Sequence, residues 1–236
     1  MAGMIYYGGE ALETVAPVRI EDVRVSPIQL SPVARQRPIR FGADFVRMSG
    51  GTRTVSITFG LLTEDKNLRS LQLMDIARWA RADEAKPLRL PGYDGVYLEA
   101  ICTGLPEPSM RQWWESKLQL VFTCFDNPYW TGIEQKSAPC GTAFVVQGTA
   151  PPLMQITRTL AGTALNQSYG RDGETMSFSP IPAGDLVIDL NRQTAAVDGV
   201  SIMQYFPLTG ATFLRPELGL QTITGTGTIT WRERWE

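Results

Sequence analysis

Two pairs of carboxylates are spaced so that each pair could act on a glycosidic bond. Asp185 and Asp189 stand four residues apart in an alternating segment, so both side chains could share one face of a strand. Glu99 and Glu107 form the second pair. A glycoside hydrolase needs only two such groups, one as general acid and one as base or nucleophile. Nothing else in the sequence indicates a pocket around either pair, so hydrolysis is the weakest function considered.

Histidine is absent from the chain. This excludes Ser-His-Asp and Cys-His catalysis, and it excludes metal sites that use histidine ligands. The three cysteines, Cys102, Cys124 and Cys140, are too few for a four-thiolate metal site and too widely spaced for a disulfide framework. We therefore expect reduced thiols, with Cys102 and Cys124 buried on apolar strands. We expect no catalytic residue, no metal site and no cofactor, and hence no enzyme.

Arginine is concentrated in one part of the chain, where a stretch of thirty residues holds a single acid, Asp44. The stretch between residues 31 and 51, SPVARQRPIRFGADFVRMSGG, is marked by prolines and reads as a long arm or loop. Arginine is the residue type suited to bidentate interface pairs, which favours a protein interface over a solvated loop or a passage for DNA. The candidate subunit-interface residues are Arg35, Arg37, Arg40, Arg47 and Arg53.

Adjacent tryptophans, Trp113 and Trp114, stand in or beside a polar loop. On a strand, neighbouring side chains point to opposite faces, so one of the two rings would lack its own core. Both are candidates for a surface that a partner covers, and packing against the second domain is the alternative. Two further tryptophans, Trp231 and Trp235, stand near the end of the sequence.

The composition describes a globular protein. The 236 residues are 43% hydrophobic and 19% charged, and 22 basic residues against 24 acidic ones give a net charge of −2. A free nucleic-acid binder normally carries a basic surplus, so that class is disfavoured. No targeting segment is visible, and no window approaches 18 uncharged apolar residues, so no membrane span is expected.

The first part of the chain predicts strands and one helix. The segment 52–62 alternates cleanly, and a helix is expected after an N-cap at Thr63, because apolar residues recur near the helical period. The face expected to be buried comprises Leu68, Leu71, Leu73, Ile76, Ala77, Trp79 and Ala80. Strands are expected over 88–90, 96–103 and 117–125.

The second part predicts only short strands, separated by turns such as Asp172-Gly173 and Asp198-Gly199. This spacing is typical of a β-sandwich or jelly roll. The fold class is therefore mainly β with one helix. We place a boundary after the break at Asp126-Asn127-Pro128, which gives two domains, 1–135 and 136–236.

Several segments, in this order, resemble a known family. TVSITFGLL leads into the leucine-rich helix, followed by LRLPGYDGVYLEAICTG and by LQLVFTCFDNPYWTG with its aromatic-Asp-x-Pro-Tyr break. Later come GDLVIDLNRQTAAVDGVS and the closing PELGLQTITGTGTITWRERWE. Nearly the whole chain resembles the distal tail proteins of long-tailed phages, through order and short motifs rather than one diagnostic signature.

The resemblance implies a fold and a role. The first domain would have the tail-tube-like fold, a β-sandwich or split barrel with one flanking helix, and would close into a hexameric ring. The second would be a galectin-like β-sandwich outside the ring, without an inserted sugar-binding module. The ring would join the tail tube to the tail-tip hub.

The same resemblance implies where the protein acts and with what. It would be assembled in the host cytoplasm and reside in the virion, at the tail tip. Its partners would be further copies of itself, the tail tube protein, the hub protein, and tape-measure or receptor-binding proteins. DNA would meet it only in transit through the ring.

The residues leave a second function open, a carbohydrate-binding β-sandwich that attaches to the host surface. Tryptophans and a polar strand face would carry it. Galectin-type binding resembles a site of histidine, asparagine and arginine around a tryptophan. The second domain has no histidine, and its asparagines are Asn166 and Asn191. Host-surface binding by this chain is therefore the less favoured function.

Overall fold

The structure is a computed structural model that describes residues 4–36, 43–105, 117–207 and 212–236, without the side chains of residues 31–36, 43–50 and 66. It forms two compact units, Met1–Trp130, with which Glu236 is grouped, and Thr131–Trp235. β9 (Trp130–Gly132) lies where the chain passes from one unit to the other. Each unit is described separately below.

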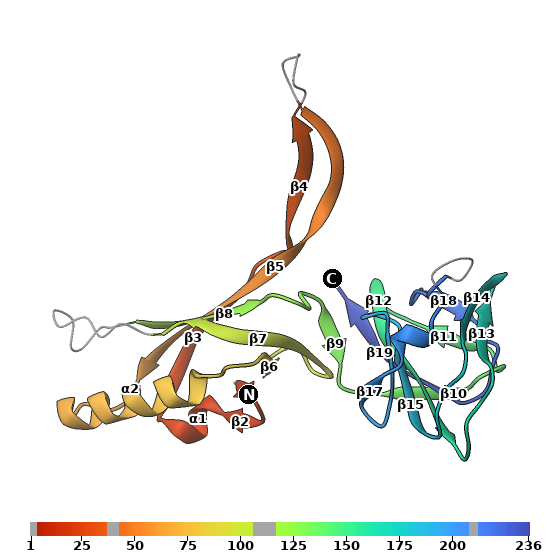
Figure 1. The fold of residues 1–236 in the computed structure, drawn as a ribbon. Helices are drawn as coiled ribbons and strands as arrows, with labels where there is room; N and C mark the ends of the chain where they lie inside the picture. The colour runs from red at the N-terminus through yellow and green to blue at the C-terminus, as the bar shows by residue number, and fades with distance from the viewer. Residues whose placement is uncertain (1–3, 37–42, 106–116, 208–211) are drawn as a thin grey trace. The chain divides into compact units, whose positions relative to one another are not determined.

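In its described residues, the first unit contains antiparallel strands and two helices (Figure 1). Its elements are β1 (Tyr6–Tyr7), β2 (Glu10–Ala11), α1 (Leu12–Val15), β3 (Val18–Val25), β4 (Gln29–Gln36), β5 (Ala43–Leu61), α2 (Lys66–Ala80), β6 (Lys86–Arg89), β7 (Val96–Gly104) and β8 (Leu118–Cys124).

Strand β5 organises the first unit, because its inner part pairs with β3 on one side and β8 on the other. β8 pairs in turn with β7, and β7 continues through β6 to β1 and β2. Along β5 the side chains alternate, and Val55, Ile57 and Phe59 are fully buried, as the period-two pattern predicts. A cluster of Tyr7, Trp79 and Phe122, packed edge to face, completes the core.

Helix α2 begins two residues later than the sequence indicates. Its N-cap is Asp65, whose carboxylate accepts hydrogen bonds from the backbone N–H groups of Asn67 (2.8 Å) and Leu68 (3.3 Å). The hydroxyl of Thr63, the expected cap, instead accepts a hydrogen bond from Gln72 Nε2 at 2.8 Å. The helix buries Ile76, Trp79 and Ala80, while Leu68 and Leu71 are exposed, so the expected apolar face is only partly the buried one.

Where the structure describes it, the second unit is built from short antiparallel strands and one 3₁₀ turn. Its elements are β10 (Lys136–Pro139), β11 (Phe144–Val146), β12 (Ala150–Leu160), β13 (Gln167–Arg171), β14 (Glu174–Phe178), β15 (Gly184–Asp189), β16 (Thr194–Val197), β17 (Val200–Ser201), η1 (Met203–Tyr205), β18 (Gly219–Gln221) and β19 (Thr228–Trp235).

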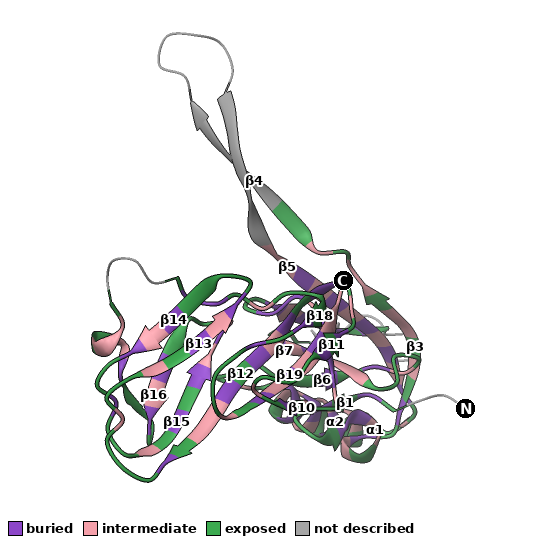
Figure 2. Ribbon diagram, turned by 90° about the vertical axis from the view of Figure 1, so that its right-hand side faces the viewer, coloured by how far each residue is buried: buried purple, intermediate pink, exposed green. Residues whose placement is uncertain are grey.

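The largest sheet of the second unit runs in the order β10, β19, β12, β15, β16, β17, and two strand pairs, β11–β18 and β13–β14, accompany it. Buried and exposed residues alternate along β12 and β15 (Figure 2). Buried side chains such as Tyr169, Phe178 and Ile229 form one core. Such alternation is typical of a sheet with one face packed and one face in water.

The expected fold class is confirmed, because the chain is mainly β with one helix of more than a single turn, α2, in the described residues. The predicted turns are also present: Asp172 (φ 50°) and Asp198 (φ 48°) precede Gly173 and Gly199, and all four have positive φ. The three cysteines are free, as expected. Cys124 is buried, but Cys102 is only half-buried, since it lies nearer the end of β7.

Candidate subunit interface

The arginine-rich segment contains a hairpin arm, formed by β4 and the outer part of β5, rather than an irregular loop. Gln29 pairs with Thr52 near the base of the arm, and Gln36 pairs with Ala43 near its tip. The arm extends away from the rest of the first unit (Figure 1). In the described part of the chain, β4 pairs only with β5, so both edges of the arm are open. Isolated two-stranded hairpins are marginal in water, and open edges readily pair with other strands.

The base of the arm contains a close backbone approach. The register between β4 and β5 shifts between Gln29 and Ser31, opposite the Gly50-Gly51 pair. A Cβ atom on Gly51 would lie 1.4 Å from the backbone oxygen of Gln29, which no side chain can do. Glycine is therefore required at this position, and the irregularity fixes how the arm leaves the sheet.

The arm distributes the candidate arginines along its two strands. Arg35 is on β4, opposite Asp44, and Arg47 is on β5, opposite Val33. Arg37 and Arg40 lie outside the described residues, as do Trp113 and Trp114. The structure thus places two of the arginines on the arm and leaves the two tryptophans as predictions.

Arg53 differs from the other candidates because its side chain is buried, with 5% of the residue exposed. β5 and β8 position it, since Arg53 pairs with Cys124 across the two strands. Its guanidinium lies over the indole ring of Trp130, 6.0 Å from the ring centre. The atoms Nε and Nη1 have no hydrogen-bond partner. In this structure Arg53 is therefore not accessible to a neighbouring subunit, which corrects its place among the candidates.

Burial also governs the electrostatics around Arg53. It lowers the pKa of the Arg53 guanidinium, and the neighbouring Cys124 opposes this effect. The same burial raises the pKa of the Cys124 thiol to about 11. A thiol with so high a pKa is a poor nucleophile at neutral pH, so Cys124 is a packed structural residue.

The first pair of carboxylates considered for hydrolysis, Asp185 and Asp189, has structural contacts. Asp185 accepts a hydrogen bond from Thr159 Oγ1 at 2.7 Å. Asp189 accepts one from Gln155 Nε2 at 3.2 Å, and it also accepts the backbone N–H groups of Asn191 and Arg192 in the following turn. Glu107 lies outside the described residues. Across the described ranges, no three of the side chains that commonly hold metals lie together as a metal site.

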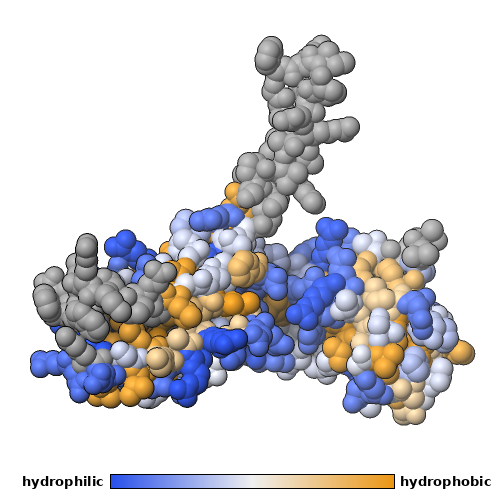
Figure 3. Space-filling view, turned by 60° about the vertical axis from the view of Figure 1, so that its left-hand side comes forward, coloured by the Kyte–Doolittle hydropathy of each residue, from blue (hydrophilic) through white to orange (hydrophobic). Residues whose placement is uncertain are grey.

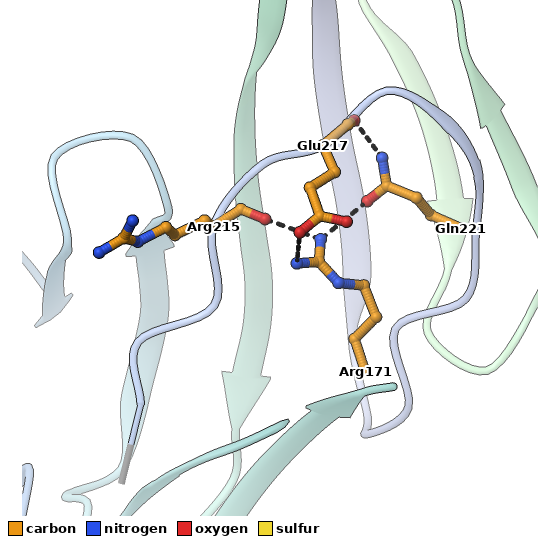
Figure 4. Close-up of polar contacts among 4 residues, drawn as sticks. All are labelled: Arg171, Arg215, Glu217 and Gln221. Atoms are coloured by element: carbon orange, nitrogen blue, oxygen red, sulfur yellow. Dashed lines mark hydrogen bonds and ion pairs between the residues drawn. The ribbon is translucent and has the colours of Figure 1, made fainter. Parts of the chain in front are cut away.

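An ion pair between a buried arginine and an exposed glutamate in the second unit has no counterpart in the sequence analysis. Arg171 Nη2 lies 2.7 Å from Glu217 Oε1, and Arg171 Nη1 donates to the backbone oxygen of Arg215 (2.7 Å) and to Gln221 Oε1 (3.2 Å). The Gln221 amide donates to the backbone oxygen of Glu217, which closes the network (Figure 4). The network attaches the segment 215–221 to β13. The alternation of β13 could have indicated that Arg171 points inward, but not which residues it would meet.

No helix among the described residues is both long and apolar enough to cross a membrane. This finding concerns helices alone.

Comparison with solved structures identifies the fold. The chain matches the crystal structure of the Dit protein of phage SPP1 with a TM-score of 0.73 and 15% sequence identity, over 99% of each chain. That protein is described as a paradigm of the hub adsorption apparatus in phages that infect Gram-positive bacteria. The fold of this chain is thus the Dit fold, which confirms at the level of fold the resemblance to distal tail proteins.

Two structures of the phage P2 baseplate in its activated conformation also match. The structure with calcium has a TM-score of 0.48 and 8% sequence identity, and the structure with strontium has a TM-score of 0.42 and 9% sequence identity. Each match covers 93% of this chain and 91% of the other. No protein-family model matches the sequence, and no curated protein matches it.

Proposed function

We propose that this chain, which has the Dit fold over nearly its whole length, is a distal tail protein. It is a structural protein of the virion that forms a hexameric ring and joins the tail tube to the tail-tip hub. The observation that carries the proposal is the correspondence with the SPP1 Dit protein over 99% of both chains. A match of that extent includes both units, so it is more than a shared small sheet.

The arm supports the oligomeric part of the proposal. It projects two open strand edges that the described part of the chain leaves unpaired. Such edges are aggregation hazards unless a specific partner covers them, and neighbouring copies in a closed ring are such partners. The residues 29–52 contain four arginines and one acid, so acidic groups on a neighbouring copy would pair with them.

The position in the virion defines the remaining partners. On one side the ring meets the tail tube protein, and on the other the hub, with tape-measure or receptor-binding proteins as further contacts. DNA passes through the ring without stable binding. The protein is assembled in the host cytoplasm and acts at the tail tip. It has a structural and not a catalytic role, which is supported by the hydrogen bonds that Asp185 and Asp189 accept in strands and turns.

The carbohydrate-binding alternative gains no support from the second unit. Trp231 is 5% exposed and packs in the core against Phe144, with ring centres 4.7 Å apart. A sugar site needs an accessible aromatic face beside several converging polar groups. Titration of the protein against host cell-wall glycans tests this point, and saturable binding in the low micromolar range would favour the alternative.

The ring itself is tested by native mass spectrometry and negative-stain electron microscopy of the purified chain. We expect a closed hexamer. A persistent monomer at all concentrations, or rings with a rotational symmetry other than six or three, would contradict the proposal.

The arm is tested in the same assay. Replacing Arg35, Arg37 and Arg40 by alanine should weaken assembly, and assembly should be weaker still at high salt if exposed ion pairs contribute. The control replaces Arg192 and Arg215, two exposed arginines of the second unit, and should leave the ring intact. Assembly of the triple variant equal to that of the control at every salt concentration would remove the arm from the interface.

A further inference from the structure

Helix α2 presents a row of large apolar side chains to solvent. Leu68, Leu71 and Met74 recur every third residue, which places them on one side of the helix, and their exposed fractions are 47%, 58% and 64%. We call these three residues the α2 stripe. The adjacent side of the helix, with Ile76 and Trp79, is buried in the core of the first unit. The stripe is therefore apolar surface that the helix exposes in addition to the apolar face that it packs into the core.

The end of the sheet beside the helix adds to this surface. Leu62, which directly follows β5, is 63% exposed, although its backbone N–H is fixed by a hydrogen bond to the oxygen of Pro17 at 3.0 Å. Apolar surface is visible over the end of the first unit where α2 lies (Figure 3). A contiguous exposed apolar patch on a soluble protein commonly marks an interaction site.

A second apolar surface lies at the other end of the same strand pair. In the register of β5 and β8, Phe59 pairs with Leu118 at the end near Leu62, and Arg53 pairs with Cys124 at the far end. Phe125, the next residue, is 54% exposed. Tyr93 stacks on Trp130, the ring that Arg53 also contacts, with ring centres 4.2 Å apart, and it is also exposed. The length of β8 separates the two surfaces by roughly 20 Å.

We propose that these two surfaces bind each other between copies of this chain, so that the α2 stripe of one copy packs on the Phe125 end of the next. The occupant of the stripe is therefore a second copy. A contact between two different surfaces of one unit is head-to-tail, and repeated around an axis it closes a ring. A two-fold contact of stripe against stripe would leave the Phe125 end uncovered. The proposal rests on the ring function proposed above and names its contact surfaces.

The size of the surfaces sets what they contribute. A stable interface buries about 800 Å² on each partner. Three or four half-exposed aliphatic side chains supply the apolar centre of such an interface and not its whole area, so the arm provides the remainder. A few well-packed residues near the centre of an interface carry most of its binding energy.

The test uses one charged substitution in each surface of the full-length chain. Leu71→Glu and Phe125→Glu should each lower assembly affinity by roughly 30-fold or more, because a buried carboxylate replaces an apolar contact. Leu165→Glu in the second unit, at a leucine that is 80% exposed, is the matched control and should assemble as the unmodified chain does. Circular dichroism melts verify that all three variants are folded.

Mixing the two variants distinguishes the possible contacts. Leu71→Glu keeps the Phe125 end intact, and Phe125→Glu keeps the α2 stripe intact. An equimolar mixture should therefore form heterodimers and nothing larger, which analytical ultracentrifugation measures. Self-association of Phe125→Glu alone into dimers would show a stripe-to-stripe contact and overturn the proposal. Hexamers formed by Leu71→Glu would overturn it while leaving the ring function standing, whereas failure of the unmodified chain to assemble would contradict both.

Discussion

The guanidinium of Arg53 lies over the indole of Trp130 at 6.0 Å, while Tyr93 stacks on the same indole with ring planes 12° apart. Arg53 is thus held by packing and by attraction between its charge and the ring, since two of its three nitrogens have no hydrogen-bond partner. Burying a charge is costly, and the Glu236 carboxylate counters only part of the effect of burial on Arg53, whose pKa remains lowered. The aromatic contact offsets part of this cost, and that balance can be measured.

We predict that Arg53→Met changes the free energy of unfolding by less than about 1 kcal/mol, because methionine fills similar space and removes two unsatisfied donors. Urea denaturation of the full chain measures this change. Arg192→Met, at an exposed arginine, is the control. A loss above about 2 kcal/mol would show that the guanidinium makes a stabilising interaction beyond the contact with Trp130.

Cys124 should make the protein less stable in alkali. Its pKa in the folded chain, about 11, lies above the ordinary thiol value of 9.0 because the side chain is buried, so the folded state holds the proton more tightly than the unfolded state. The contribution to stability is complete below pH 9 and is lost as the pH rises towards 11. Denaturation at pH 8, 9 and 10 measures it, as does slow reaction of the native thiol with a disulfide reagent.

The control for this prediction is Cys124→Ala, which lacks the titrating group. It should show a shallower fall of stability across the same pH range, even though the cavity lowers its stability at every pH. Equal slopes for the variant and the unmodified chain would mean that Cys124 does not carry the effect.

The sequence predicts those features that are decided locally. Asp172-Gly173 and Asp198-Gly199 turn as expected, since the positive φ that a tight hairpin needs is tolerated by aspartate and favoured by glycine. The strand from Thr52 follows its alternation. By contrast, Pro32 suggests a loop but stands in β4, because a strand at the edge of a sheet can lack one N–H donor.

Features decided by distant residues are not predictable in this way. Leu68 and Leu71 have the spacing of a core face, yet periodicity cannot tell which apolar side of a helix its own chain covers. Arg53 belongs by composition to the exposed arginine group, and its burial depends on Trp130, far along the chain. The candidate interface could therefore be located from charge and length, but the accessibility of its members could not.

The base of the arm gives a third prediction. In Gly51→Ala the new Cβ would meet the backbone oxygen of Gln29 at 1.4 Å, so the two strands must separate locally. We expect a loss of about 1–3 kcal/mol in stability and a larger defect in assembly, since the arm leaves the sheet at a changed angle. Gly162→Ala is the control, because nothing lies within 4 Å of the added atom. Unchanged assembly of Gly51→Ala would show that the geometry of the arm is not critical.

The network around Arg171 gives the last prediction, an asymmetry between its two charged partners. The Arg171 side chain is 3% exposed, whereas that of Glu217 is 58% exposed. Removing the arginine in Arg171→Ala leaves a cavity and an unpaired amide oxygen on the buried Gln221, so we expect a loss of about 3 kcal/mol in the free energy of unfolding. Glu217→Gln keeps the hydrogen bonding of a partner that water already screens, and should cost less than about 1 kcal/mol.

Urea denaturation of both variants in the same buffer, followed by near-ultraviolet circular dichroism, measures this asymmetry. Salt separates the two effects further, because screening acts on the exposed carboxylate and not on the buried hydrogen bonds to Arg215 and Gln221. The loss in Glu217→Gln should therefore shrink in high salt, while the loss in Arg171→Ala should persist. Equal losses for the two variants would mean that the ion pair, and not the burial of the guanidinium among backbone and amide acceptors, holds the segment 215–221 on β13.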